Sequence, residues 1–223
     1  MSQQRRTLLK ALAGATALAT PLSRAASLLS TPPQAKGPFY PLELPLDQDS
    51  NLVRVSGRRG VAQGVIIDVY GRVLDRDGAP LTGVKLEIWQ VNAFGRYHHP
   101  HDEQNKPWDP DFQGFGRTVT DADGAYHFRT VRPVAYPGRA PHIHFALGDS
   151  RIATFYTQMY LAGAPENDRD FLLTRVRDAR ARANLIVDLQ PFPRSAGETA
   201  ADAPELIGRF DIVLGETILS RKP

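Results

Sequence analysis

The chain has 223 residues and contains no cysteine. Disulfide bridges therefore cannot stabilise it, and the thiolate ligands that most structural zinc sites use are missing. We expect its stability to come from a hydrophobic core, a bound metal and contacts between subunits. Any metal site must be built from nitrogen and oxygen donors.

A long hydrophobic run is also missing. The weakly apolar stretch from Ala11 to Leu22 is too short to span a bilayer, so we expect no membrane span. It follows Arg5, Arg6 and Lys10 and precedes small residues, a pattern that resembles a twin-arginine export signal. We therefore expect residues 1–26 to be a signal peptide and the mature protein to be periplasmic or extracellular. An ordinary basic-then-apolar secretion signal is the alternative.

The mature chain lacks an excess of charge of one sign. The formal charge of +3 depends on four basic residues of the leader, which are Arg5, Arg6, Lys10 and Arg24. Without them, 23 basic residues stand against the 24 acidic residues of the chain, a net charge near −1. The mature chain therefore lacks the excess of basic residues that nucleic-acid binding needs, and we exclude nucleic acid as a partner.

Long helical patterns are scarce. Residues 27–51 are rich in proline and lack periodicity, which predicts an extended arm that packs on a neighbouring surface. From residue 52 onwards, short β-branched stretches alternate with turn sequences. They predict strands at Val65 to Leu74, Val84 to Gln90, Ala125 to Val131, His142 to Leu147, Thr154 to Tyr160, Leu185 to Leu189 and Leu206 to Leu214.

This pattern favours an all-β fold, an antiparallel β-sandwich formed by a single domain over residues 52–223. One short helix is expected over Asp170 to Ala181, where charged residues interrupt an apolar pattern. The stretch from Asn92 to Arg117 is long for a connection, and long ordered loops are usually functional.

The sequence Tyr136-Pro-Gly-Arg-Ala-Pro-His-Ile-His-Phe145 carries the most chemistry. In a strand, His142 and His144 project to one face, while Ile143 and Phe145 project to the other. Alternating histidines can simply line a polar surface, but the nearby Tyr136 and the glycine-flanked Tyr97 favour a metal site. Imidazoles together with phenolates suit Fe(III), although two histidines also suit zinc or copper.

Other polar residues are expected to have structural roles. Arg139 is either a salt-bridged loop residue or a cation that stabilises charge on a substrate. We expect surface positions for His98, His99 and His101, a structural role for His127, and a solvated or ion-paired face for Arg129 and Arg132. Tyrosines expected to pack with one end in water are Tyr126, Tyr156 and Tyr160.

Several separated segments together resemble the intradiol ring-cleavage dioxygenases, and among these the iron-bearing β chains that act on protocatechuate. The segments are Gly37 to Pro41, Leu86 to Asn92, Gly95 to Tyr97, Asp109 to Arg117, Tyr126 to Pro133, Tyr136 to Phe145 and Phe210 to Leu214. The resemblance implies a β-sandwich, an oxygen-dependent enzyme of aromatic compound catabolism and one Fe(III) per chain. It further implies that the iron ligands are Tyr97, Tyr136, His142 and His144.

The resemblance also implies a reaction. A catechol binds as a dianion, Tyr136 takes up a proton, Arg139 stabilises charge on the ring, and Gln158 lies near the substrate. The ring then opens with O2 to a cis,cis-muconate. Catechol or hydroxyquinol are alternative substrates, and a non-catalytic transthyretin-like or carbohydrate-binding module is the alternative from another class.

Two features bear on specificity and assembly. Gly138 stands where the family's protocatechuate β chains carry a tryptophan, so we expect a wider pocket or one filled from elsewhere. The arm at Gly37 to Pro41 could help to shape the active site in a homo-oligomer, and a related second chain is possible.

Overall fold

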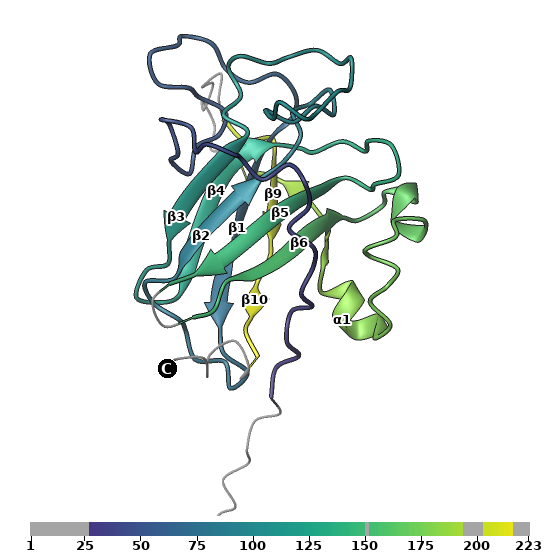
Figure 1. Ribbon diagram of the computed structural model, residues 1–223. Helices are drawn as coiled ribbons and strands as arrows, with labels where there is room; N and C mark the ends of the chain where they lie inside the picture. Colours follow the sequence, from purple (N-terminus) through teal and green to yellow (C-terminus); the bar gives the residue numbers. More distant parts are fainter. Residues whose placement is uncertain (1–26, 150–151, 194–202, 216–223) are drawn as a thin grey trace, which may run out of the picture.

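The computed structural model describes residues 27–149, 152–193 and 203–215, so the expected signal peptide lies outside the described residues. Two five-stranded sheets pack face to face, as Figure 1 shows. One sheet contains β1 (Ile66–Leu74), β4 (Ala125–Val131), β8 (Gln190–Pro191), β9 (Leu206–Arg209) and β10 (Ile212–Val213). The other has the order β3 (Phe115–Val119), β2 (Lys85–Trp89), β5 (His142–Gly148), β6 (Phe155–Leu161) and β7 (Ile186–Val187).

The predicted β-sandwich is confirmed, but its sheets are mixed rather than purely antiparallel. Strand β1 pairs in parallel with β9 and β10, and β6 pairs in parallel with β7. A parallel pair needs a long crossover. The segment between β6 and β7 supplies one, because it contains a 3-10 helix (Pro165–Asp168) and the helix α1 (Ala179–Ala183).

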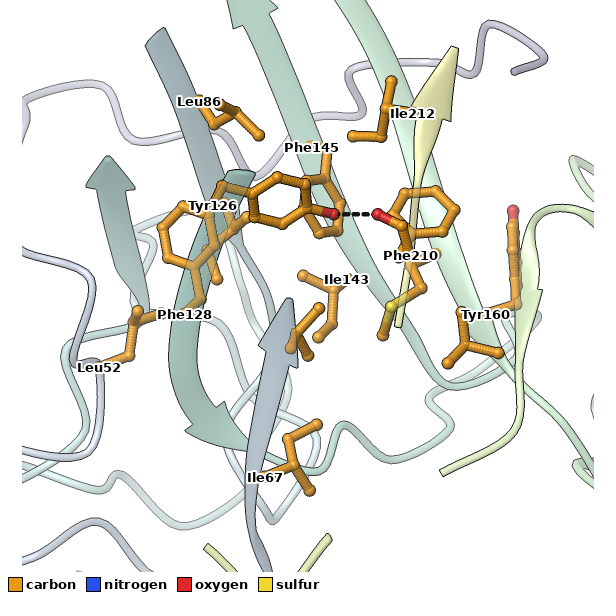
Figure 2. Packing of buried hydrophobic residues seen from close by; sticks show 14 of the residues in the cluster. Leu52, Ile67, Leu86, Tyr126, Phe128, Ile143, Phe145, Tyr160, Phe210 and Ile212 are labelled. Atoms are coloured by element: carbon orange, nitrogen blue, oxygen red, sulfur yellow. Dashed lines mark hydrogen bonds between the residues drawn. The ribbon is translucent and has the colours of Figure 1, made fainter. Parts of the chain in front are cut away.

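The core lies between the sheets and is built from alternate residues of their strands. Figure 2 shows Phe128, Phe145 and Phe210 packed together with branched aliphatic residues from both sheets. The hydroxyl of Tyr126 donates to the backbone carbonyl of Phe210 inside this core. The expectation that Tyr126 keeps one end in water is therefore wrong, because a buried carbonyl satisfies its hydroxyl.

Two elements differ from the sequence-based expectation. The helix begins at Ala179, with Asp178 as its N-cap, and does not extend back to Asp170. Turns precede it, since the Asp170 carboxylate binds the backbone N–H groups of Leu172 and Leu173. Strand β3 begins inside the stretch expected to be a loop, at Phe115, and runs on to Val119.

The glycine of β3, Gly116, has a packing role. A Cβ on Gly116 would lie 2.5 Å from the carbonyl oxygen of Asp49 and from Leu52, so the close approach of residues 49–52 requires glycine there. A glycine in a strand often marks such a close approach of another backbone. The sequence Gly114-Phe-Gly116 therefore does not mark the end of regular structure.

The N-terminal arm packs on its own chain, along β6 and towards the metal-ligand candidates (Figure 1). Thr31 N donates to Val213 O at 2.9 Å, and Gln34 N donates to Tyr156 O at 2.8 Å. Thr157 Oγ1 donates to Pro32 O at 2.9 Å. The arm therefore reaches the site within one chain, while homo-oligomer formation and a second chain stay predictions.

Within the described ranges, no helix is long and apolar enough to cross a membrane.

A buried ion pair joins β1 to β4. The Asp68 side chain, in a residue only 4% exposed, accepts from Arg129 Nε at 2.8 Å and contacts His127 Nε2 at 3.1 Å. Burial alone would raise the Asp68 pKa, but the hydrogen bonds from His127 and Arg129 outweigh it and lower the pKa below its ordinary value of 3.8. The ionised carboxylate therefore stabilises the fold.

We predict that Asp68→Asn lowers the free energy of unfolding by about 1–3 kcal/mol at pH 7. A carboxyl with a lowered folded-state pKa stabilises above its unfolded-state pKa, and this stabilisation is lost as pH falls through the folded-state pKa. The difference between variant and wild type should therefore shrink below about pH 4. Denaturant titrations at several pH values measure it. A difference that stays constant down to pH 2.5 would contradict the assignment.

Candidate active site

Four donor atoms converge at one end of β5. His142 Nε2 lies 3.1 Å from His144 Nε2, which lies 3.2 Å from Tyr97 Oη. Tyr97 Oη lies 3.5 Å from Tyr136 Oη. Nitrogen and oxygen donors that share one first-row ion at about 2 Å are themselves roughly 3–3.5 Å apart. The donor set therefore fits a single metal ion.

Three structural elements contribute these side chains. Alternation along β5 points both histidines away from the core, Tyr97 comes from the loop after β2, and Tyr136 begins the turn before β5. Among the described residues there is no cluster of three or more His, Asp or Glu side chains that could bind a metal. The tyrosines must therefore complete a site here.

Neighbouring groups orient the two imidazoles. His142 Nδ1 lies 2.6 Å from the carbonyl oxygen of Ala140, which makes Nδ1 the protonated nitrogen and leaves Nε2 as the donor atom. The ring of His144 stacks on Trp89 with a centroid distance of 4.8 Å. Burial, followed by the charge of Arg139, lowers the pKa of His142 to about 3. The ring is therefore neutral, as a metal ligand must be.

The two phenols are held in their protonated form unless a cation is present. Burial, followed by the proximity of Tyr136, raises the pKa of Tyr97 well above its ordinary value of 10.0. Burial also raises the pKa of Tyr136, although Tyr97 and Arg139 oppose this. A metal ion can hold a phenol as the phenolate. Deprotonation of these residues is thus coupled to cation binding.

Arg139 has the ion pair that was one of its two expected roles, while the substrate role stays a prediction. Its Nε donates to Asp170 Oδ2 at 2.8 Å, which makes it a buried ion-paired residue. Its Nη1 also lies 3.5 Å from Tyr136 Oη, beside the donor set. Sequence reasoning missed Asp170, because a lone Asp in a charged segment carries no signal of its own.

Gln158 and Tyr160, both on β6, contact the guanidinium of Arg139. Gln158 is 0% exposed, accepts from Arg139 Nη2 at 2.5 Å and donates to the carbonyl of Ala35 at 2.9 Å. Gln158 thus contacts Arg139, and its expected place near a substrate stays a prediction. The hydroxyl of Tyr160 contacts Arg139, Gln158 and Gln34, so the expectation of a hydrated end is wrong here.

The N-terminal arm covers the outer side of the donor set. Gly37 has φ of +75°, and a Cβ on it would lie 3.2 Å from His144 Cε1. Phe39 stacks on Tyr97 with ring centroids 4.6 Å apart. The sequence predicted that the arm at Gly37 to Pro41 could help to shape the active site in a homo-oligomer, whereas here Gly37 and Phe39 make these contacts within one chain.

Of the three loop histidines, His99 is buried, which contradicts the expected surface position, and His98 is half-buried. His99 is 6% exposed, and Phe39 lies against its ring. His98 stacks on Trp108 at 3.8 Å between ring centroids, and burial lowers its pKa to about 4. Only His101 is exposed as expected. The loop after β2 is packed tightly enough to bury these rings.

A cavity of about 260 Å³ adjoins the donor set, lined by Tyr136, Gly138, Arg139, Glu166, Arg169 and Asp170. A Cβ on Gly138 would meet no atom within 4 Å, so space is open on that side. Gly138 has φ of +78° in the turn that Arg139 N closes onto Tyr136 O. The glycine thus permits the turn that brings Tyr136 and Arg139 to the same cavity.

Comparisons with known proteins place the chain in a family. The sequence model of the family described as Dioxygenase matches residues 35–215. The protocatechuate 3,4-dioxygenase β chain of Burkholderia cepacia is 41% identical over 178 residues, covering 76% of this chain and 72% of that protein. A catechol 1,2-dioxygenase of Candida albicans is 30% identical over 152 residues, and the match spans only 48% of its length.

Solved structures show the same fold. The dioxygenase domain of a dioxygenase carbohydrate-binding protein fusion from Streptomyces sp. SirexAA-E superposes with a TM-score of 0.61 and 32% identity, over 83% of this chain and 98% of that one. Catechol 1,2-dioxygenase from Acinetobacter sp. ADP1 gives a TM-score of 0.62 and 25% identity, over 86% of this chain and 66% of that one. With its matched sequence, its sandwich and its converging donor atoms, the chain belongs to the intradiol dioxygenase family.

Proposed function

We propose that this protein is an Fe(III)-dependent dioxygenase that cleaves a catechol ring between its two hydroxyl-bearing carbons with O2, giving a cis,cis-muconate. The convergence of two imidazoles and two phenols, with donor atoms 3.1–3.5 Å apart, carries the proposal. Tyr97, Tyr136, His142 and His144 would hold one ion per chain. Two phenolates nearly neutralise a ferric ion and favour it over the ferrous state.

A bound ferric ion would act as a Lewis acid and as a template for the catechol oxygens. The protein's own groups supply the rest. Tyr136 is the more exposed phenol and adjoins the cavity, so its Oη can accept a proton from a catechol hydroxyl. Arg139 Nη1, 3.5 Å from that oxygen, can stabilise negative charge on the substrate. The arm and Trp89 keep water from the histidines.

For the substrate, we propose a catechol that carries a carboxylate, of the protocatechuate type. The relative from Burkholderia cepacia supports it. So does Arg169, which lines the cavity, is exposed and forms no ion pair with another described residue. Arg139 is already paired with Asp170, so Arg169 is the cation left for a substituent. Catechol and hydroxyquinol dioxygenases are also among the relatives, at 30–31% identity.

We further propose that the protein acts after export, since the paired arginines of residues 1–26 resemble a twin-arginine signal. That pathway carries folded proteins, so the metal would be inserted before transport. Assembly as a homo-oligomer is part of the same proposal.

The visible spectrum tests the iron site. Purified protein should show a tyrosinate-to-iron absorption band that shifts on anaerobic addition of a catechol. We predict that His144→Ala lowers iron content by more than about tenfold and removes the band, because one of four donors is lost. His101→Ala, an exposed histidine of the neighbouring loop, is the control and should keep both. A wild-type protein that stays colourless after ferric reconstitution would sink the proposal.

Substrate preference is tested at the cavity. Arg169→Gln should raise KM for protocatechuate roughly two- to fivefold, as expected for a partly exposed ion pair worth about 0.5–1 kcal/mol. KM for catechol should stay the same. Glu166→Gln removes an anion from the same cavity and should lower KM for protocatechuate. Equal effects of Arg169→Gln on both substrates would argue against carboxylate recognition, and faster turnover of catechol by the wild type would favour the alternative substrate.

A further inference from the structure

No sequence pattern indicated a function for Asp170. In the structure, however, its carboxylate lies beside the site and accepts four hydrogen bonds. The residue is 1% exposed. Its Oδ2 accepts from Arg139 Nε at 2.8 Å and from Ala140 N at 2.9 Å. Its Oδ1 accepts from the backbone N–H groups of Leu172 and Leu173, each at 3.0 Å. Each oxygen thus has two donors, and the group has little freedom to move.

The contact to Nε determines how the Arg139 guanidinium is turned. A guanidinium is a planar group with a fixed arrangement of N–H donors. With Nε on Asp170 and Nη2 on Gln158 at 2.5 Å, Nη1 is the nitrogen left to face Tyr136 Oη. Without the Asp170 contact, rotation about the terminal side-chain bonds would move Nη1 away from the reacting groups.

Through its contact with Ala140 N, Asp170 also affects His142, one of the metal-ligand candidates. The carbonyl of Ala140 lies 2.6 Å from His142 Nδ1 and so selects the tautomer that presents Nε2 to the donor set. Because Asp170 holds the N–H of Ala140, it limits rotation of the backbone that carries this carbonyl. A single carboxylate thus fixes both Arg139 and the partner of His142.

We propose that Asp170 is a positioning residue for the dioxygenase reaction, which sets the orientation of the Arg139 guanidinium and of the His142 ring. This inference rests on the proposed function. It assigns Asp170 a role beyond that of an ordinary buried ion pair that ties the segment after β6 to the sandwich.

A second buried Asp–Arg pair serves as a control for the possibility that Asp170 only stabilises the fold. Asp68 and Arg129 form a second Asp–Arg pair, also with Nε to a carboxylate oxygen at 2.8 Å, in the other sheet. Asp68 is 4% exposed, so its removal disturbs a similarly buried carboxylate. Asp68→Asn should therefore lower stability without changing the turnover number of the folded enzyme.

The test measures kcat, KM, iron content, anaerobic catechol affinity and melting temperature for the iron-loaded wild type and its variants. We expect Asp170→Asn to lower kcat about 10- to 100-fold. We expect Asp170→Asn to slow Arg139→Gln by a smaller factor than it slows the wild type, because the part of its effect that passes through Arg139 is already lost there, while the part that passes through Ala140 and His142 remains. Multiplicative losses, or a lower melting temperature with kcat unchanged, would overturn the proposal.

Two further measurements keep the outcome clear if Asp170→Asn folds poorly. Arg139→Lys keeps the positive charge but lacks the Nε donor, so it should lose kcat to a similar degree, and full activity of this variant would overturn the proposal. In metal-free protein, the Arg139 Nε–H resonance should be protected from solvent exchange and lose this protection in Asp170→Asn but not in Asp68→Asn. Wild-type activity in the same assay tests the proposed function separately, since the positioning role is judged on ratios between variants and on this resonance.

Discussion

The structure depends on the burial of β5 on both of its faces. Ile143 and Phe145 fill the core between the sheets, while His142 and His144 project outwards and are buried as well. Because side chains alternate along a strand, the hydrophobic core fixes the direction of the histidines. A slip of one residue in the pairing with β2 and β6 would bury the imidazoles in the core and abolish the donor set. The sandwich therefore specifies the site through its register.

The outward face of β5 would be open to solvent without additional cover. The arm supplies part of this cover with Gly37 and Phe39, and Trp89 of β2 supplies another part through its stack on His144. This cover keeps both rings neutral and both phenols protonated until a cation arrives. Because burial penalises charge, deprotonation of the two phenols requires a cation that can hold them as phenolates.

Local sequence patterns predicted the parts of the fold that depend on alternation. They placed β1, β2, β4, β5 and β6 to within about a residue of the structure, and the His-X-His pattern indicated a metal site. Strand β3 was missed because its glycine serves a close backbone contact, and α1 was placed too early because Asp170 forms turns. Tyr97 was indicated by its glycine-flanked position and by the family resemblance, whereas Gln158 came from the resemblance alone. The arm at Gly37 was expected at the active site, but in a homo-oligomer. The role of Asp170 could not be foreseen, since it depends on tertiary approach, as in the contact between Arg139 and Asp170 across 31 residues.

The docking of the arm has a consequence for how the site assembles during synthesis. Val213 N donates to Thr31 Oγ1 across 182 positions of the sequence, so the arm is held by a strand that is synthesised long after the arm itself. Contacts between such distant parts of a chain slow folding, because a large loop must close before they form. The cover over His144 therefore forms late. A nascent chain would expose its imidazoles until the arm and β10 have met.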